Sequence, residues 1–162
     1  MERRTRLGDW ELDTIIGKGH HQALVSLTER TSRFTLLAKV ARKRADLVAT
    51  AVIGWLKPLR LPLHTLTSDN GKEFAYHEAI AQALKAQFFF AHPYASWERG
   101  LNENTNGLIR RYFPRPRLFA TLTEEEIQTV MAKLNNRPRK SLGFQTPNQV
   151  CFGIIPSVAL AS

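Results

Sequence analysis

The sequence predicts one α/β domain with a mixed five-stranded sheet and helices on both faces, in the order βββαβαβα with one further helix. Short apolar runs separated by turn residues continue up to Val40. The apolar spacing then becomes helical from Leu47. A later apolar run, residues 88–91, lies between two segments with helical spacing, as in a βα unit.

Residues 10–17, 23–28 and 34–40 are predicted as strands, and the short turns between them predict an antiparallel meander. In the first strand, Asp13 falls near the middle and on the opposite face from Trp10 and Leu12. The His20-His21 pair has no partner at metal-ligand spacing, so we interpret it as turn surface.

The elements that follow are a helix over 47–55 that Pro58 stops, a short strand over 63–67 ending at Asp69-Asn70-Gly71, a small helix over 76–85 and a strand over 88–91. The strand over 88–91 is expected to be buried, because it is continuously apolar and flanked by helices. Residues 101–112 are predicted to be helical despite a polar, glycine-rich composition that disfavours helix.

The last helices are indicated by their first residues. Thr123 and Glu126 have the spacing of a capping box, ahead of an apolar face formed by Ile127, Val130, Met131 and Leu134. Thr146-Pro147 predicts a further turn of helix, because proline is favoured at the first helical position.

Charge is the most informative feature of the composition. Of 162 residues, 23 are Lys or Arg and 14 are Asp or Glu, which gives a formal charge of +9. This excess favours a polyanionic partner, most simply nucleic acid. The single cysteine excludes a disulfide within the chain and a cysteine-rich zinc site. No apolar run approaches about 18 residues and no signal-peptide pattern occurs, so we expect a cytoplasmic protein.

Three carboxylates are candidates for a metal site: Asp13 within the first strand, Asp69 after the fourth, and Glu103 in the polar helix. Clustered carboxylates repel unless cations neutralise them, and Mg²⁺ prefers oxygen ligands. Two such ions can activate a nucleophile and stabilise a leaving oxygen in phosphodiester chemistry. Each residue also has a structural alternative: Asp13 on a solvated strand face, Asp69 as a turn residue, and Glu103 as an exposed helix residue.

Three segments carry a family resemblance: Trp10-Glu11-Leu12-Asp13-Thr14-Ile15-Ile16-Gly17; Thr67-Ser68-Asp69-Asn70-Gly71-Lys72-Glu73-Phe74; and His92 to Gly100 followed by Asn102 to Pro114. They resemble the catalytic core of insertion-sequence-30 type transposases, within the DDE transposase and retroviral integrase group. The resemblance covers about residues 8–152. It implies a ribonuclease-H-like fold, with residues 1–8 as a basic lead-in, 9–152 as the catalytic core and 153–162 as a tail.

The resemblance also implies the chemistry. Asp13, Asp69 and Glu103 would be the catalytic triad and hold two Mg²⁺ ions, for which Mn²⁺ can substitute. The reaction would be nicking at the ends of a DNA element, followed by attack of the freed 3′-hydroxyl on target DNA, by a homo-oligomer on DNA in the bacterial cytoplasm. No glycine-rich phosphate-binding motif occurs, which agrees with chemistry that uses no nucleotide cofactor.

Supporting residues are predicted from their positions. The residues expected to contact DNA, or in the case of Asn106 and Arg110 to orient the triad, are Arg99, Asn106, Arg110, Arg111, Arg115 and Arg117. His92 could hold a water or a phosphate, or be structural. Gly107 could admit DNA, or serve packing.

One feature departs from the family. Full-length relatives carry an N-terminal helix-turn-helix region that recognises element ends, whereas this chain begins a few residues before the first predicted strand. End-specific recognition by this chain alone is therefore not expected. The alternatives to a transposase core are a nuclease of the same fold that only hydrolyses, and an inactive DNA-binding remnant.

Overall fold

The computed structural model describes residues 6–91, 96–115 and 117–153, with the backbone alone for residues 96–103. Five strands form one sheet: β1 (Asp9–Ile16), β2 (Ala23–Glu29), β3 (Thr35–Val40), β4 (Thr65–Ser68) and β5 (Gln87–Phe90). Their spatial order is β3-β2-β1-β4-β5. The predicted mixed five-stranded sheet is therefore confirmed.

The sheet is mixed because two kinds of connection meet at β1. Strands β1, β2 and β3 pair antiparallel, as short turns require. Strands β4 and β5 run parallel to β1, since a helical crossover precedes each of them. Strand β1 thus lies between the meander and the parallel pair, and it belongs to both.

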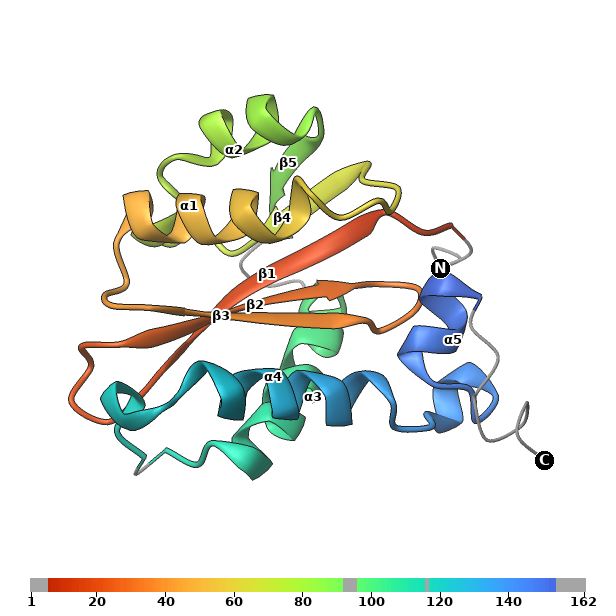
Figure 1. Cartoon of the computed structure of the whole chain (residues 1–162). Coiled ribbons are helices and arrows are strands. Elements are labelled where there is room, and N and C mark those ends of the chain that lie inside the picture. Colours follow the sequence, from red (N-terminus) through yellow and green to blue (C-terminus); the bar gives the residue numbers. More distant parts are fainter. Residues whose placement is uncertain (1–5, 92–95, 116, 154–162) are drawn as a thin grey trace.

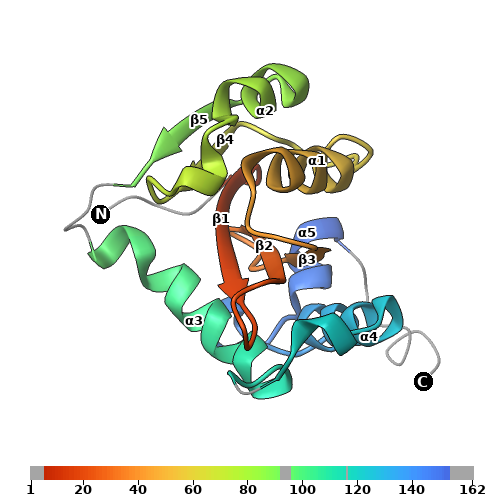
Figure 2. The ribbon, with the colours of Figure 1, turned by 90° about the vertical axis from the view of Figure 1, so that its left-hand side faces the viewer.

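The helices are α1 (Ala45–Leu56), α2 (His77–Leu84), α3 (Ser96–Tyr112), α4 (Glu124–Asn135) and α5 (Pro147–Phe152), with short 3₁₀ turns η1 (Lys72–Phe74), η2 (Phe119–Thr121) and η3 (Lys140–Leu142). Helices α1 and α2 cover one face of the sheet, and α3, α4 and α5 lie on the other (Figures 1 and 2). Every residue of β2 is buried, because helices cover both faces of the sheet there.

The hydrophobic core fills the layers on both sides of the sheet. Its largest fully buried side chains include Trp10, Phe74, Phe113 and Phe119, which come from different elements. Burying a large apolar side chain contributes roughly 1.5–3 kcal/mol, so this core accounts for much of the stability of the domain.

The strand predicted over 88–91 is present as β5, but the prediction that it is buried was wrong. Phe88 and Phe90 pack beneath α2, against each other and against His77. Phe89 is 49% exposed, and β5 is the edge strand of the sheet. An apolar run shows that a strand is present, but it cannot show whether one face or both are covered.

The helix ends refine the other predictions. Helix α3 begins five residues before the predicted start at residue 101, and α1 ends at Leu56 before reaching Pro58. Thr123 caps α4 by accepting a hydrogen bond from the Glu126 N–H, as predicted. The turn predicted after Thr146 is α5, closed by a complete capping box between Thr146 and Gln149.

Within the described part of the chain, no helix has the length and apolarity needed to cross a membrane. The predicted lead-in over 1–8 and tail over 153–162 fall largely outside the described residues.

Candidate active site

Asp13 lies in β1, and Asp69 directly follows β4, the neighbouring parallel strand. Asp9 pairs with Thr65 across β1 and β4, and these residues are 56 positions apart, as are Asp13 and Asp69. The backbone pairing ends at Glu11 with Thr67, and Asp13 and Asp69 each lie two residues further along the chain. If the register continued over these two residues, their side chains would point to the same face, and Asp13 is on the face that α3 contacts through Asn106.

The Asp13 carboxylate is half-buried and held from two directions. Its Oδ1 accepts a hydrogen bond from the Thr14 N–H at 2.8 Å, and its Oδ2 accepts one from Asn106 Nδ2 at 2.6 Å. Asn106 lies in α3, so this contact ties the helix to the middle of β1. The Asn106 Oδ1 is buried and accepts no hydrogen bond within the described residues.

The Asp69 carboxylate is also half-buried, directly after β4. Its Oδ1 accepts a hydrogen bond from the Gly71 N–H at 3.0 Å, which forms a local side-chain turn. The carboxyl ends of parallel strands are where open α/β sheets bind ligands. The turn role of Asp69 is thus confirmed, and its role in a site stays a prediction.

Glu103 lies in α3, one helical turn before Asn106, but its side chain falls outside the described residues. Residues three apart on a helix share a face, and the Asn106 side of α3 is the side that contacts Asp13. Among the described residues no group of three or more His, Cys, Asp or Glu side chains forms a metal site. The placement of the third carboxylate therefore stays a prediction.

Arg110 fixes the other end of this helix. Its Nη2 donates to the Ile16 carbonyl at 2.8 Å, and its guanidinium lies 5.8 Å from the centre of the Phe119 ring. Burial lowers the pKa of Arg110, and the charge of Arg115 acts in the same direction. A Cβ on Gly17 would lie 2.5 Å from Phe119, so only glycine lets β1 end against this ring. Arg110 thus anchors α3 beside β1.

An open groove of about 930 Å³ runs from this contact towards the β1–β2 turn. Lys18, His20 and Arg115 line it, together with Asn106 and Gly107 of α3. Apart from the backbone of α3 itself, no atom of the described residues lies within 4 Å of the position that a Cβ on Gly107 would take, so no tight packing contact among them requires glycine there. The groove is cationic, and it begins next to Asp13.

The remaining predicted residues are distributed as follows. Arg111 and Arg115 are exposed, while Arg117 forms an ion pair with Glu126 at 2.9 Å. His92 and the side chain of Arg99 lie outside the described residues. His20 is exposed in the turn after β1, as predicted, and it lines the groove together with Lys18, which the sequence did not single out. The backbone of His20 is left-handed, with φ 58°, and no motif signals it.

The residues present fit a divalent cation. Two half-buried carboxylates, Asp13 and Asp69, supply the hard oxygen ligands that Mg²⁺ prefers. The buried Asn106 Oδ1 is an additional acceptor beside Asp13 with no protein donor in the described part of the chain. Such an acceptor suits a bound water or cation, because a buried polar atom without a partner is costly.

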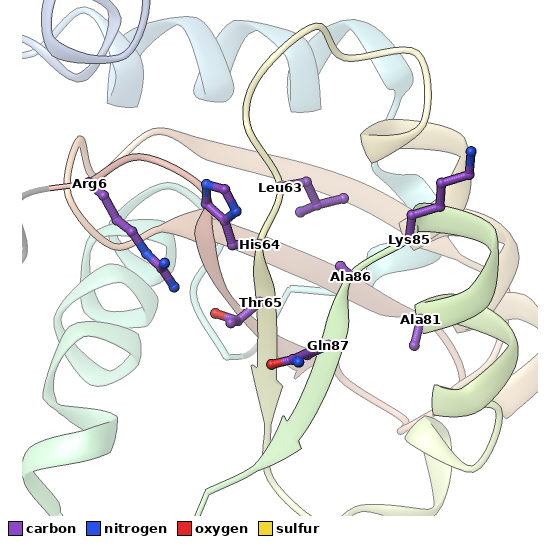
Figure 3. Close-up of a pocket in the computed structure, with 8 residues that line it drawn as sticks. All are labelled: Arg6, Leu63, His64, Thr65, Ala81, Lys85, Ala86 and Gln87. Carbon is purple, nitrogen blue, oxygen red and sulfur yellow. The ribbon is translucent and has the colours of Figure 1, made fainter.

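A second pocket, of about 460 Å³, lies at the amino ends of β4 and β5, at the opposite end of these strands from Asp69. Arg6 and Lys85 lie on opposite sides of it (Figure 3), so their charges do not converge on one ligand. Arg6 is moreover paired with Asp9 at 2.9 Å. No carboxylate of the described residues lines this pocket, in contrast to the end of the strands where Asp13 and Asp69 lie.

The fold has a counterpart among solved structures. The structure superposes on the catalytic core domain of BIV integrase with a TM-score of 0.70, covering 94% of this chain and 97% of that domain at 20% sequence identity. The predicted ribonuclease-H-like fold is confirmed by this match. No protein-family model matches the chain.

Sequence relatives narrow the class further. The chain is 48% identical over its whole length to the transposase for insertion sequence element IS4351 of Bacteroides fragilis, and it covers 50% of that protein. It is 40% identical over 93% of its length to the InsI transposase for insertion sequence element IS30A of Escherichia coli K12, and it covers 39% of that protein. Its close relatives are thus insertion-sequence-30 type transposases, as the motifs indicated, and the chain spans half or less of their length.

Proposed function

We propose that this chain is the catalytic core of a DNA transposase, which cleaves and joins DNA strands by metal-dependent displacement at phosphorus. The observation that carries the proposal is the parallel pairing of β1, which contains Asp13, with β4, which Asp69 directly follows, together with the hydrogen bond from Asn106 of the Glu103 helix to Asp13. The sequence relatives are transposases, which supports the same chemistry.

Asp13, Asp69 and Glu103 would hold two divalent cations, Mg²⁺ or Mn²⁺. When bound, the cations would supply Lewis acidity to the scissile phosphate and lower the pKa of an attacking water. The residues of the chain position these groups. Asn106 fixes one oxygen of Asp13, and Arg110 fixes the helix on which Glu103 lies. No protein nucleophile is needed, since water and then the freed 3′-hydroxyl attack phosphorus directly.

The cationic groove gives DNA a path to these carboxylates. Lys18 and Arg115 would neutralise phosphates along it, and the exposed Gly107 leaves room for the sugar–phosphate backbone close to α3. Arg111 would extend this surface, whereas the guanidinium of Arg117 already has Glu126 as a partner. The catalytic core would span residues 9–152, bind element ends and target DNA, and act as a homo-oligomer on DNA in the bacterial cytoplasm.

The test is charge removal at the three carboxylates. Asp13→Asn, Asp69→Asn and Glu103→Gln should each lower Mn²⁺-dependent nicking by about 10³-fold or more, since several kcal/mol of charge stabilisation depend on the cations. DNA binding and the free energy of unfolding should change little. Asp46→Asn is the matched control. It removes an exposed carboxylate of α1 that is not one of the three, and it should keep full activity.

The same assay separates the alternatives. Strand transfer from pre-nicked DNA identifies a transposase, while cleavage without joining identifies a nuclease. Metal-independent DNA binding without cleavage at any Mn²⁺ concentration would identify an inactive remnant. Full nicking activity in any one carboxylate variant would remove that residue from the site.

A further inference from the structure

Glu73 is a buried carboxylate that the proposed chemistry does not use. It lies in η1, is 6% exposed, and its Oε2 is 3.5 Å from Lys43 Nζ. Lys43 comes from the segment between β3 and α1, and its side chain is 37% exposed. The pair therefore joins two loops at the end of the sheet where Asp69 lies.

The Glu73 carboxylate rests directly against the loop of Asp69. A Cβ added to Gly71 would clash with the Glu73 side-chain carboxyl group, so the carboxylate occupies the space that any other residue would fill. The Gly71 N–H in turn donates to Asp69 Oδ1. Lys43, Glu73, Gly71 and Asp69 thus form one continuous series of contacts.

This arrangement is expensive if it serves stability alone. Removing a carboxylate from water costs several kcal/mol, and one half-exposed ammonium at 3.5 Å compensates only part of that cost. A glutamine or an apolar side chain would fill the same space at a lower cost. A charged pair does, however, fix the position of a loop. In a metal site the carboxylate ligands must be held within about 0.5 Å of the geometry in which they bind the ion.

We propose that the Lys43–Glu73 ion pair is a positioning element for Asp69. It presses the Gly71 peptide against Asp69 Oδ1 and so fixes the orientation in which that carboxylate meets a divalent cation. Lys43 also neutralises the charge of Glu73, which would otherwise add to the repulsion between the neighbouring carboxylates. The inference rests on the proposed function, since it assumes that Asp69 binds a cation.

The test is Mn²⁺ binding by the 162-residue protein, followed through the electron paramagnetic resonance signal of the free ion. Glu73→Gln and Lys43→Met should each raise the dissociation constant by about tenfold, the usual effect of losing a partner of a metal ligand. The double variant should be no weaker than either single variant, because both break one contact series. Lys43→Arg keeps the positive charge and should bind Mn²⁺ as the wild type does. Arg44→Met, which removes the neighbouring charge that pairs with Asp46, is the control and should bind as the wild type does.

Several outcomes would overturn the inference. Unchanged Mn²⁺ affinity in Lys43→Met would do so, and this variant serves even if Glu73→Gln does not fold, because Lys43 is partly exposed. Additive losses in the double variant would instead identify Glu73 as a direct ligand. If the wild type binds Mn²⁺ and Asp69→Asn does not, the proposed function stands whatever the Lys43 variants do. A wild type that binds no Mn²⁺ would overturn both.

Discussion

The outer edge of β3 and the carboxyl ends of β1 and β4 differ in how far their polar groups are hydrogen-bonded within the protein. At the β3 edge, Asn135 bonds both the N–H and the carbonyl of Thr35, each at 2.8 Å. The Leu37 N–H donates to Met131 Sδ, and its carbonyl accepts from Trp55 Nε1. Helices α4 and α1 thus satisfy the outward-facing backbone groups at Thr35 and Leu37, and this part of the edge cannot pair with another strand.

At the carboxyl ends of β1 and β4, the polar groups are only partly satisfied from within the protein. Asn106 donates to Asp13, but its Oδ1 accepts nothing within the described residues. Asp13 and Asp69 are half-buried, and Gly107 borders open space. The backbone groups of Thr35 and Leu37 thus have protein partners, whereas Asn106 Oδ1 has none among the described residues and lies beside the Asp13 carboxylate, as expected of a site that receives a ligand.

Two asparagines provide the sharpest test of this difference. Asn135→Ala should lower the free energy of unfolding by about 2–4 kcal/mol, since it leaves the buried N–H and carbonyl of Thr35 without partners. Its nicking activity per folded molecule should be unchanged. Asn106→Ala should do the reverse: little loss of stability, but a roughly 10–100-fold loss of activity, since it releases Asp13.

Urea unfolding and a nicking assay on the same samples measure both effects. If Asn106→Ala destabilised the protein as much as Asn135→Ala, with no separate loss of activity, both asparagines would serve the fold alone. Asn136→Ala, at the exposed position next to Asn135, controls for the removal of an amide from the end of α4.

The sequence predicted the sheet because it follows from local patterns, and it predicted a site at Asp13 and Asp69, which stays a prediction. Strand periodicity locates the two residues, and the chirality and shortness of the connections place β4 beside β1. The sequence did not predict the roles of Asn135, Lys43 or Glu73. Asn135 sits at the end of a helix, where its residue type suggests only a stop signal, and its partner lies 100 positions away. Such contacts depend on how the helices dock, which periodicity does not encode.

Gly54 and Gly107 test the open space beside the site. Both lie within helices, one in α1 and one in α3, and in the part of the chain that the structure describes a Cβ added to either would meet no atom within 4 Å beyond its own helix backbone. Gly54→Ala and Gly107→Ala should each stabilise the protein by up to about 1 kcal/mol, because glycine is a poor helix former. Gly107→Leu should nevertheless weaken DNA binding by roughly fivefold or more, about 1 kcal/mol, since it narrows the groove. Gly54→Leu should leave DNA binding unchanged.

Affinity for a DNA duplex, measured at several salt concentrations, distinguishes the two positions. Equal DNA affinity in Gly107→Leu and Gly54→Leu would show that DNA does not approach α3 along this groove. A loss of stability in Gly107→Ala would show that position 107 needs glycine for the fold.

The smallest expected effect lies at the amino ends of the same two strands. Asp9 accepts hydrogen bonds from Arg6 and from Thr65 Oγ1, so this end of the β1–β4 pair is closed, whereas the Asp13–Asp69 end is open. The hydrogen bonds and charge of Arg6, with Thr65, hold the pKa of Asp9 below its ordinary value of 3.8. A carboxyl group with a lowered pKa in the folded state stabilises the protein above its unfolded pKa. This contribution disappears as the pH falls through the folded-state pKa.

Asp9→Asn should therefore be less stable than the wild type at about pH 6, by less than about 1 kcal/mol because the Arg6 side chain is exposed. The two proteins should converge as the pH falls well below 3.8, where the wild-type carboxyl group becomes protonated. Urea unfolding at a series of pH values measures the difference. A constant difference at all pH values would mean that Asp9 acts only through hydrogen-bond geometry. The charge of Asp9 would then contribute nothing to the stability of this end of β1 and β4, and only its hydrogen bonds would distinguish it from the Asp13–Asp69 end.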